Sequence, residues 1–182
     1  MIDLAEKRTE IIELLQDRLE DSIDLMMQAR QAHLNVAKNK NLMMEKLFGK
    51  VYSDADGYID LIAARIEQLE GYSPGTIQSV VKSGLTDYPL GTSNCEGDLS
   101  DLAYSIACYN ELIRNAISRS AKLSDNVTER LFTKVSLGVD MNLWHTSRNA
   151  DQDERVHKSR DRVSVVEHND RNPVYRRTAI YR

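Results

Sequence analysis

An all-α fold is predicted by this sequence: a four-helix bundle in which a long crossover joins the second helix to the third. Apolar residues recur at steps of three and four in four separate blocks, and no block shows the strict alternation of a strand. Short polar links join the blocks in two pairs, and a much longer stretch, residues 71–96, lies between the pairs. Two antiparallel hairpins joined by one crossover form a four-helix bundle.

Each helix is justified by its own apolar stripe, and the stripes predict helices over residues 12–34, 44–69, 99–117 and 127–143. Asp125 or Asn126 is placed to cap the fourth helix, with Glu129 in its first turn. A crossover of this length is unusual unless it has a role, and we expect its segment 76–82 to form a short helix. Proline and glycine interrupt the crossover at Pro74, Gly75, Gly84, Pro89 and Gly91.

The domain organisation follows from where the helical pattern stops. A chain of 182 residues is expected to hold one domain, which we place at residues 1–148. The apolar pattern fades from about Asn149, and residues 149–182 are predicted to be a flexible tail. The end of this tail is basic, because residues 171–182 contain four arginines and no acid.

Composition narrows the classes of function. The formal net charge of -4 means that the molecule as a whole is not attracted to polyanions, so any contact with nucleic acid must be local. Cys95 and Cys108 form neither a disulfide framework nor a metal-binding spacing, which favours free thiols in a reducing compartment. There is no signal-peptide core and no apolar run of the roughly 20 residues that span a bilayer. We therefore expect a cytoplasmic protein without a membrane partner.

Several short strings resemble one known family. Residues 31–35 read Gln-Ala-His-Leu-Asn, and residues 60–65 read Asp-Leu-Ile-Ala-Ala-Arg. Residues 87–90 read Asp-Tyr-Pro-Leu, and residues 140–144 read Asp-Met-Asn-Leu-Trp. These strings stand in order and on the expected elements. Over roughly residues 8–147 the chain resembles the Dps family, the ferritin-like proteins of starved cells that shield DNA from iron and peroxide.

The resemblance implies an iron site shared between two subunits of a homo-dodecameric cage, with two ferrous ions as its substrate. Carried over by position, His33 is the first-helix ligand and Asp60 is the ligand from the partner's second helix. Glu45, still an oxygen ligand, stands where the family has a second histidine. Gly49 and Ala64 stand where the family has an aspartate and a bridging glutamate, and neither residue can bind a metal. The resemblance thus implies a site that has lost ligands.

Other acidic and basic residues bear on this site. Asp56 lies one turn before Asp60, and Glu67 lies about one turn after Ala64. Either acid could replace a missing ligand, although solvated surface acids are the plainer interpretation. Arg130 stands where Dps proteins have an aspartate that lines a three-fold pore, and a cation there would oppose the entry of ferrous ions.

The tail is the candidate nucleic-acid interface. Guanidinium groups contact phosphates, and the neighbouring tyrosines Tyr175 and Tyr181 could stack on exposed bases. Copies of the tail in an oligomer would add weak contacts by avidity. A solvated, unstructured end is the competing interpretation. The residues expected to contact DNA are Arg171, Arg176, Arg177 and Arg182.

Three functions remain open from sequence alone. The first is a dodecameric cage that oxidises ferrous iron and stores ferric mineral, protecting DNA under stress. The second is a ferroxidase-silent shell that binds or compacts DNA through its arginine tails, which would associate it with the nucleoid. The third is a ferritin-like interaction protein with neither role.

Overall fold

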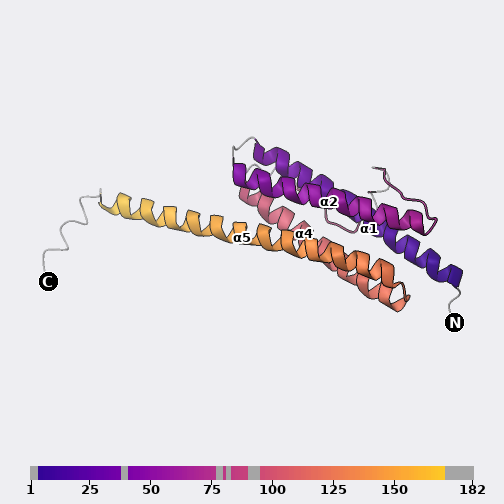
Figure 1. Cartoon of the computed structure of the whole chain (residues 1–182). Coiled ribbons are helices and arrows are strands. Elements are labelled where there is room, and N and C mark those ends of the chain that lie inside the picture. Colours follow the sequence, from indigo (N-terminus) through magenta and orange to yellow (C-terminus); the bar gives the residue numbers. More distant parts are fainter. Residues whose placement is uncertain (1–3, 38–40, 77–79, 81–82, 90–94, 171–182) are drawn as a thin grey trace. The chain divides into compact units, whose positions relative to one another are not determined.

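The structure, a computed structural model, describes residues 4–37, 41–76, 80, 83–89 and 95–170, with the side chains of residues 37, 95, 96 and 150–170 excepted. Within these residues the secondary structure is helical, without strands, which confirms the predicted all-α four-helix class (Figure 1). The helices are α1 (Leu4–Ala37), α2 (Leu42–Gln68), α4 (Cys95–Lys122) and α5 (Asn126–Asp170). The short helix expected over residues 76–82 falls mostly outside the described residues.

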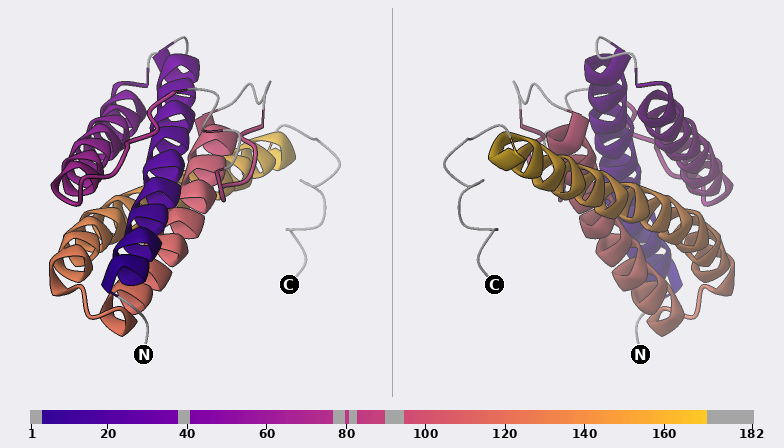
Figure 2. Two further views of the ribbon diagram at one scale, coloured as in Figure 1. Left: turned by 90° about the vertical axis from the view of Figure 1, so that its right-hand side faces the viewer. Right: turned by 90° about the vertical axis from the view of Figure 1, so that its left-hand side faces the viewer.

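The chain divides into two compact units, Met1–Ser147 and Arg148–Arg182. In the first unit, α1, α2, α4 and the first part of α5 form the bundle (Figure 2). The helix α5 continues to Asp170, although the apolar pattern predicted its end near Asn149. An apolar stripe marks only the part of a helix that packs, and residues 149–170 contain no proline or glycine to stop the helix. The domain boundary at residue 148 remains a prediction.

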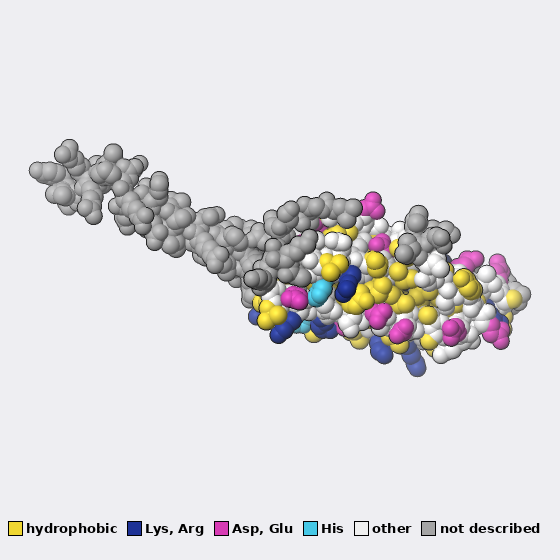
Figure 3. Space-filling view, turned by 90° about the horizontal axis from the view of Figure 1, so that it is seen from above, with side chains coloured by type: hydrophobic (Ala, Val, Ile, Leu, Met, Phe, Trp, Pro, Cys, Tyr) yellow, Lys and Arg dark blue, Asp and Glu magenta, His cyan; other side chains and the backbone are white. Residues whose placement is uncertain are grey.

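Aromatic and aliphatic side chains from all four helices fill the core. Tyr109, Phe48 and Phe132 are the largest side chains that are fully buried. On α2 most of the predicted apolar stripe is buried, whereas its members Ile59 and Leu69 are half-buried. The buried side chains are Met44, Phe48, Val51, Ala55, Ile62 and Ile66. Hydrophobic side chains also gather on the face seen in Figure 3, with acidic side chains along one of its borders. In the described part of the chain, no helix is both long and apolar enough to cross a membrane.

The helices α2 and α4 end in the same way, with a non-glycine residue in the left-handed conformation. Glu70 has a φ of 55° and Ser124 has a φ of 62°. Each helix closes with the two hydrogen bonds of a Schellman motif. The bonds, written from donor to acceptor, are Gly71 N to Ile66 O, Glu70 N to Glu67 O, Asp125 N to Ser120 O and Ser124 N to Ala121 O. Asp125 then caps α5, because its Oδ1 accepts from Val127 N and Thr128 N.

The crossover is fastened to α1 by a buried carboxylate. Asp21 accepts a hydrogen bond of 2.7 Å from Gly84 N and one of 3.3 Å from Ser83 Oγ, and it pairs with Arg18 at 2.7 Å. Burial raises the pKa of Asp21 above its ordinary value, and the opposing attraction of Arg18 does not cancel this effect. Two residues after Gly84 in the crossover, the carbonyl oxygen of Thr86 accepts a hydrogen bond of 3.0 Å from Gln28 Nε2 of α1. The long connection is therefore an ordered part of the bundle where it is described.

A tyrosine pair occupies the middle of the bundle. Tyr58 of α2 and Tyr109 of α4 stack with their ring centroids 6.4 Å apart. Tyr109 Oη exchanges a hydrogen bond of 2.7 Å with Ser22 Oγ. The hydroxyl of Tyr58 lies against Gly138 of α5 so closely that a Cβ at that position would collide with it. The glycine is thus required for the close approach of α5 to α2.

Candidate metal centre

His33 lies near the end of α1 with its ring fixed by the backbone of α2. Its Nδ1 is 3.1 Å from the carbonyl oxygen of Glu45. A carbonyl oxygen only accepts, so Nδ1 carries the proton, and in the neutral tautomer Nε2 is the nitrogen with the lone pair. This is the arrangement that orients a neutral imidazole for metal binding through Nε2.

The start of α2 determines where that carbonyl lies. Asn41 caps the helix, and its side-chain oxygen accepts from Met44 N at 3.3 Å. The next N–H, that of Glu45, bonds to Asn41 O at 3.0 Å. These bonds fix the first turn of α2 beside His33. The half-buried Glu45 belongs to this turn, and its backbone carbonyl is the atom that contacts the imidazole.

The wall next to His33 is empty where a third ligand would stand. A Cβ on Gly49 would lie 3.5 Å from Nδ1 and 3.6 Å from Cε1 of the imidazole, which is ordinary van der Waals contact. One turn before His33, the guanidinium of Arg30 lies over the ring of Tyr52, 5.5 Å from its centroid. Gly49 therefore supplies no carboxylate beside His33, although its position leaves room for a side chain.

The other predicted ligand lies far along α2. Asp60 is exposed, and it is separated from Glu45 by roughly 22 Å along the helix axis, at a rise of about 1.5 Å per residue. Asp56, Ala64 and Glu67 are exposed on the same distant half of the helix. Among the described residues, no three His, Cys, Asp or Glu side chains come together as a metal site. A single chain therefore places His33 against the backbone of Glu45 and leaves Asp60 and its neighbours apart.

Other polar residues of the recognised strings hold the fold. Asn35 donates to Asp98 Oδ1 at 2.8 Å, and Tyr88 Oη donates to the same oxygen at 2.9 Å. These bonds join the end of α1, the start of α4 and the crossover. Asp140 accepts from Asn110 Nδ2 at 2.6 Å, joining α5 to α4. Sequence reasoning missed these roles, because the partners are distant in the chain.

Arg65 has the same kind of role at the other end of α2. Its NH2 group donates to both oxygens of Asp125 at 3.1 and 3.0 Å, and its Nε donates to Thr128 Oγ1 at 3.0 Å. Burial alone would raise the pKa of Asp125, but the hydrogen bonds from Thr128 and Arg65 outweigh it and hold the pKa below its ordinary value.

The remaining predicted residues lie elsewhere or outside the described part. Arg130 is exposed in the second turn of α5, and Glu129 beside it is half-buried. The tail residues expected to contact DNA lie outside the described residues. They are Arg171, Arg176, Arg177 and Arg182.

Comparison with known proteins agrees with this fold. The ferritin-like domain family matches residues 12–156. The DNA protection during starvation protein of Agrobacterium fabrum is 29% identical over 138 residues, which cover 75% of this chain and 85% of that protein. A Dps1 mutant of Mycobacterium smegmatis has a TM-score of 0.76 at 21% identity, with 80% of this chain and 97% of that one covered. DpsC of Streptomyces coelicolor has a TM-score of 0.74 at 19% identity, with 82% and 90% covered.

The chain belongs to the ferritin-like family, whose domain matches most of its length. Within that family the resemblance to Dps proteins is confirmed, since the curated relative and the solved structures of similar fold carry that name. The structures, all under 25% identical, show the fold alone.

Proposed function

We propose that the protein is an iron-handling protein of the Dps type that acts as a shell of many copies. The observation that carries this proposal is the orientation of His33, whose Nδ1 is occupied by a backbone carbonyl so that Nε2 is left for a metal. The distance between Glu45 and Asp60 supports an intersubunit site, because these residues can meet only if two copies contribute. A homo-dodecameric cage is the assembly that the Dps resemblance implies.

Each intersubunit site would hold a single ferrous ion more readily than a pair. Its ligands would be His33 and Glu45 of one copy and Asp60 of a second copy. Joint oxidation of two ferrous ions requires carboxylates shared between them, and Gly49 and Ala64 supply none. Uptake and storage of iron therefore follow more directly from these residues than rapid ferroxidase chemistry does.

Ferrous-iron binding and oxidation by the assembled protein test this proposal. Under anaerobic conditions, His33→Ala should weaken ferrous binding at least tenfold, because it removes the one oriented imidazole. His145→Ala is the matched control, since His145 lies on α5 against Trp144 and should leave binding unchanged. Equal affinities for the two variants would sink the assignment. After addition of hydrogen peroxide, absorbance against a protein-free blank should show slow oxidation with a soluble ferric product.

A second function, DNA binding by the tail, is favoured by the sequence of residues 171–182, which holds four arginines and no acid. The name of the Agrobacterium relative, a DNA protection during starvation protein, gives it further support. The protein would then act in the cytoplasm, next to the nucleoid, as a ferroxidase-poor shell that compacts DNA.

Gel retardation of linear DNA tests the tail. A variant with all four tail arginines changed to glutamine keeps the length of the chain and should lose retention at low salt. The intact protein should retain DNA at low salt and release it as salt is raised. Retention that survives in the glutamine variant would assign the contact to another surface.

A further inference from the structure

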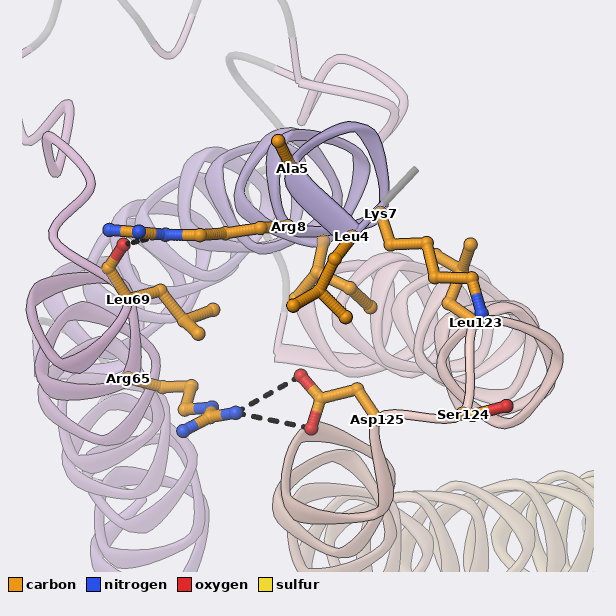
Figure 4. Close-up of a pocket in the computed structure, with 10 residues that line it drawn as sticks. Leu4, Ala5, Lys7, Arg8, Arg65, Leu69, Leu123, Ser124 and Asp125 are labelled. Carbon is orange, nitrogen blue, oxygen red and sulfur yellow. Dashed lines mark hydrogen bonds and ion pairs between the residues drawn. The ribbon is translucent and has the colours of Figure 1, made fainter. Parts of the chain in front are cut away.

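A cavity of about 630 Å³ opens at the end of the bundle where α1 begins and where α2 and α4 stop (Figure 4). Its volume lies in the range of roughly 300–1,000 Å³ that is typical of small-molecule sites. All of its lining residues belong to the first unit of the chain. They are Leu4, Ala5, Lys7, Arg8, Ile11, Arg65, Leu69, Leu123, Ser124 and Asp125.

Half of the lining is aliphatic. Leu4 and Leu69 project into the space from opposite sides, from the start of α1 and the end of α2 (Figure 4). Ile11 and Leu123 are buried side chains that form the deeper wall. Aliphatic walls favour a ligand with an apolar part, because burying apolar surface against them is favourable. They provide no hydrogen bonds for a fully polar solute.

Two of the three cations in the lining are already neutralised. Arg65 forms its two bonds with Asp125 at the back of the cavity, as the dashed lines in Figure 4 show. Arg8 donates to Leu69 O at 2.8 Å and pairs with Glu70 at the rim. These contacts connect the helices and leave little of either guanidinium for a ligand.

Lys7 is different. Among the described residues, no carboxylate lies within 4.0 Å of its ammonium group. Figure 4 shows its side chain extending from α1 to the side of Leu123. A cation near the beginning of a helix is opposed by the helix dipole, so Lys7 has no evident role in stabilising α1. The cavity thus combines apolar walls with one uncompensated positive charge.

We propose that this cavity binds an amphipathic monoanion, a carboxylate with an unbranched aliphatic chain. The chain would lie between Leu4, Leu69 and Leu123, and the carboxylate would pair with Lys7. The site is separate from the metal centre, because Lys7 and His33 are roughly 39 Å apart along α1. It does not depend on the proposed iron function.

The first test is isothermal titration of the full-length, assembled protein with octanoate, decanoate and dodecanoate, each below its micelle concentration. We expect one saturable site per chain. Each added methylene should tighten the dissociation constant roughly fourfold while the chain still lies inside the cavity. Absence of saturable binding for all three carboxylates would overturn the proposal.

Variants locate the site. Lys7→Gln should weaken decanoate at least fivefold and leave the neutral analogue decanol unchanged, and Lys134→Gln on the exposed face of α5 is the matched control. Ala5→Phe, at an exposed position on the rim, should fill the mouth and weaken both ligands. If decanoate binds Lys7→Gln and Lys134→Gln equally, or is indifferent to Ala5→Phe, it binds elsewhere and the assignment is wrong. Thermal unfolding and mass in solution should match the parent for every variant compared.

Discussion

The polar contacts inside the bundle and the polar residues of the metal centre differ in where their partners lie. Asp21 and Asp125 find their cations and N–H donors within the same chain. Within the described residues His33 bonds to a backbone carbonyl, and Asp60 is exposed to solvent. A polar group that becomes buried when the chain folds needs a hydrogen-bond partner within the folded chain. A metal ligand on the surface needs its partners only when a second copy binds. The ligand losses that the Dps resemblance implies at Gly49 and Ala64 would therefore leave the fold intact.

The largest effect is expected when carboxylates are introduced at the two positions of the candidate metal centre that lack them. The double variant Gly49→Asp/Ala64→Glu should raise the rate of ferrous oxidation by peroxide more than tenfold, because it restores a terminal and a bridging carboxylate. The new Cβ at position 49 fits, since it would meet the His33 ring at ordinary contact distance. Gly75→Asp in the crossover is the control, because a Cβ there would meet no atom within 4 Å and the residue lies outside α2. A flat rate in the double variant would show that ligand loss is not the limitation.

The next effect concerns the stability that the contacts of Asp21 with Arg18 and the crossover contribute. Asp21→Asn should lower the free energy of unfolding by about 3 kcal/mol, because it leaves the largely buried Arg18 without its counter-charge. Asp54→Asn removes a carboxylate from the half-exposed pair with Lys50 and should cost less than about 1 kcal/mol. Urea unfolding of the two variants measures the difference. Equal costs would mean that burial does not separate the two pairs.

A steric test follows for the tyrosine in the core. Gly138→Ala should destabilise the fold by about 1–3 kcal/mol, because the added Cβ collides with Tyr58 Oη. That hydroxyl is buried without a hydrogen-bond partner among the described residues. Tyr58→Phe should accordingly be neutral or stabilising, and combined with Gly138→Ala it should recover part of the loss. Additive effects in the double variant would contradict the collision.

The smallest effect is a pH dependence at the bundle end. A carboxyl whose pKa is lowered by folding contributes stability above its unfolded pKa, and that stability is lost as the pH falls through the folded value. Asp125→Asn should cost about 1 kcal/mol at pH 7, because it removes the ion pair with Arg65 and keeps the helix cap. The difference from the parent should shrink as the pH falls below 3.8, the ordinary value for an aspartate. Asp21, whose pKa is raised, should show the opposite sign.

The sequence predicted the existence of the helices better than their ends and the extent of their packing. Periodicity identified the buried face of α2 because a packed helix must carry an apolar stripe. It misplaced Leu34 and Val127, which are 48% and 57% exposed, since a stripe near a helix end does not reveal where packing stops. It also missed the continuation of α5 beyond Asn149, where no stripe is needed for a helix.

For the candidate site, residue identity was predictable and placement was not. His33 and Glu45 were named by their positions relative to the Dps resemblance, and the contact that the structure adds is between the imidazole and the backbone carbonyl of Glu45. Their role as metal ligands stays a prediction. The role of Asp98, which gathers Asn35 and Tyr88 from two other elements, depends on contacts that no local pattern encodes. The cavity beside Lys7 could not be predicted for the same reason, because three separate segments of the chain form its wall.

The left-handed residues at the two helix stops have a consequence for heat resistance. An L-residue in this conformation costs about 1 kcal/mol relative to glycine, so the molecule carries removable strain at Glu70 and Ser124. Glu70 also pairs with Arg8, whereas the Ser124 side chain is exposed. Ser124→Gly should therefore raise the melting temperature by about 2–4 °C, as differential scanning calorimetry would show. The protein can thus be made more thermostable at a position remote from both the metal centre and the core.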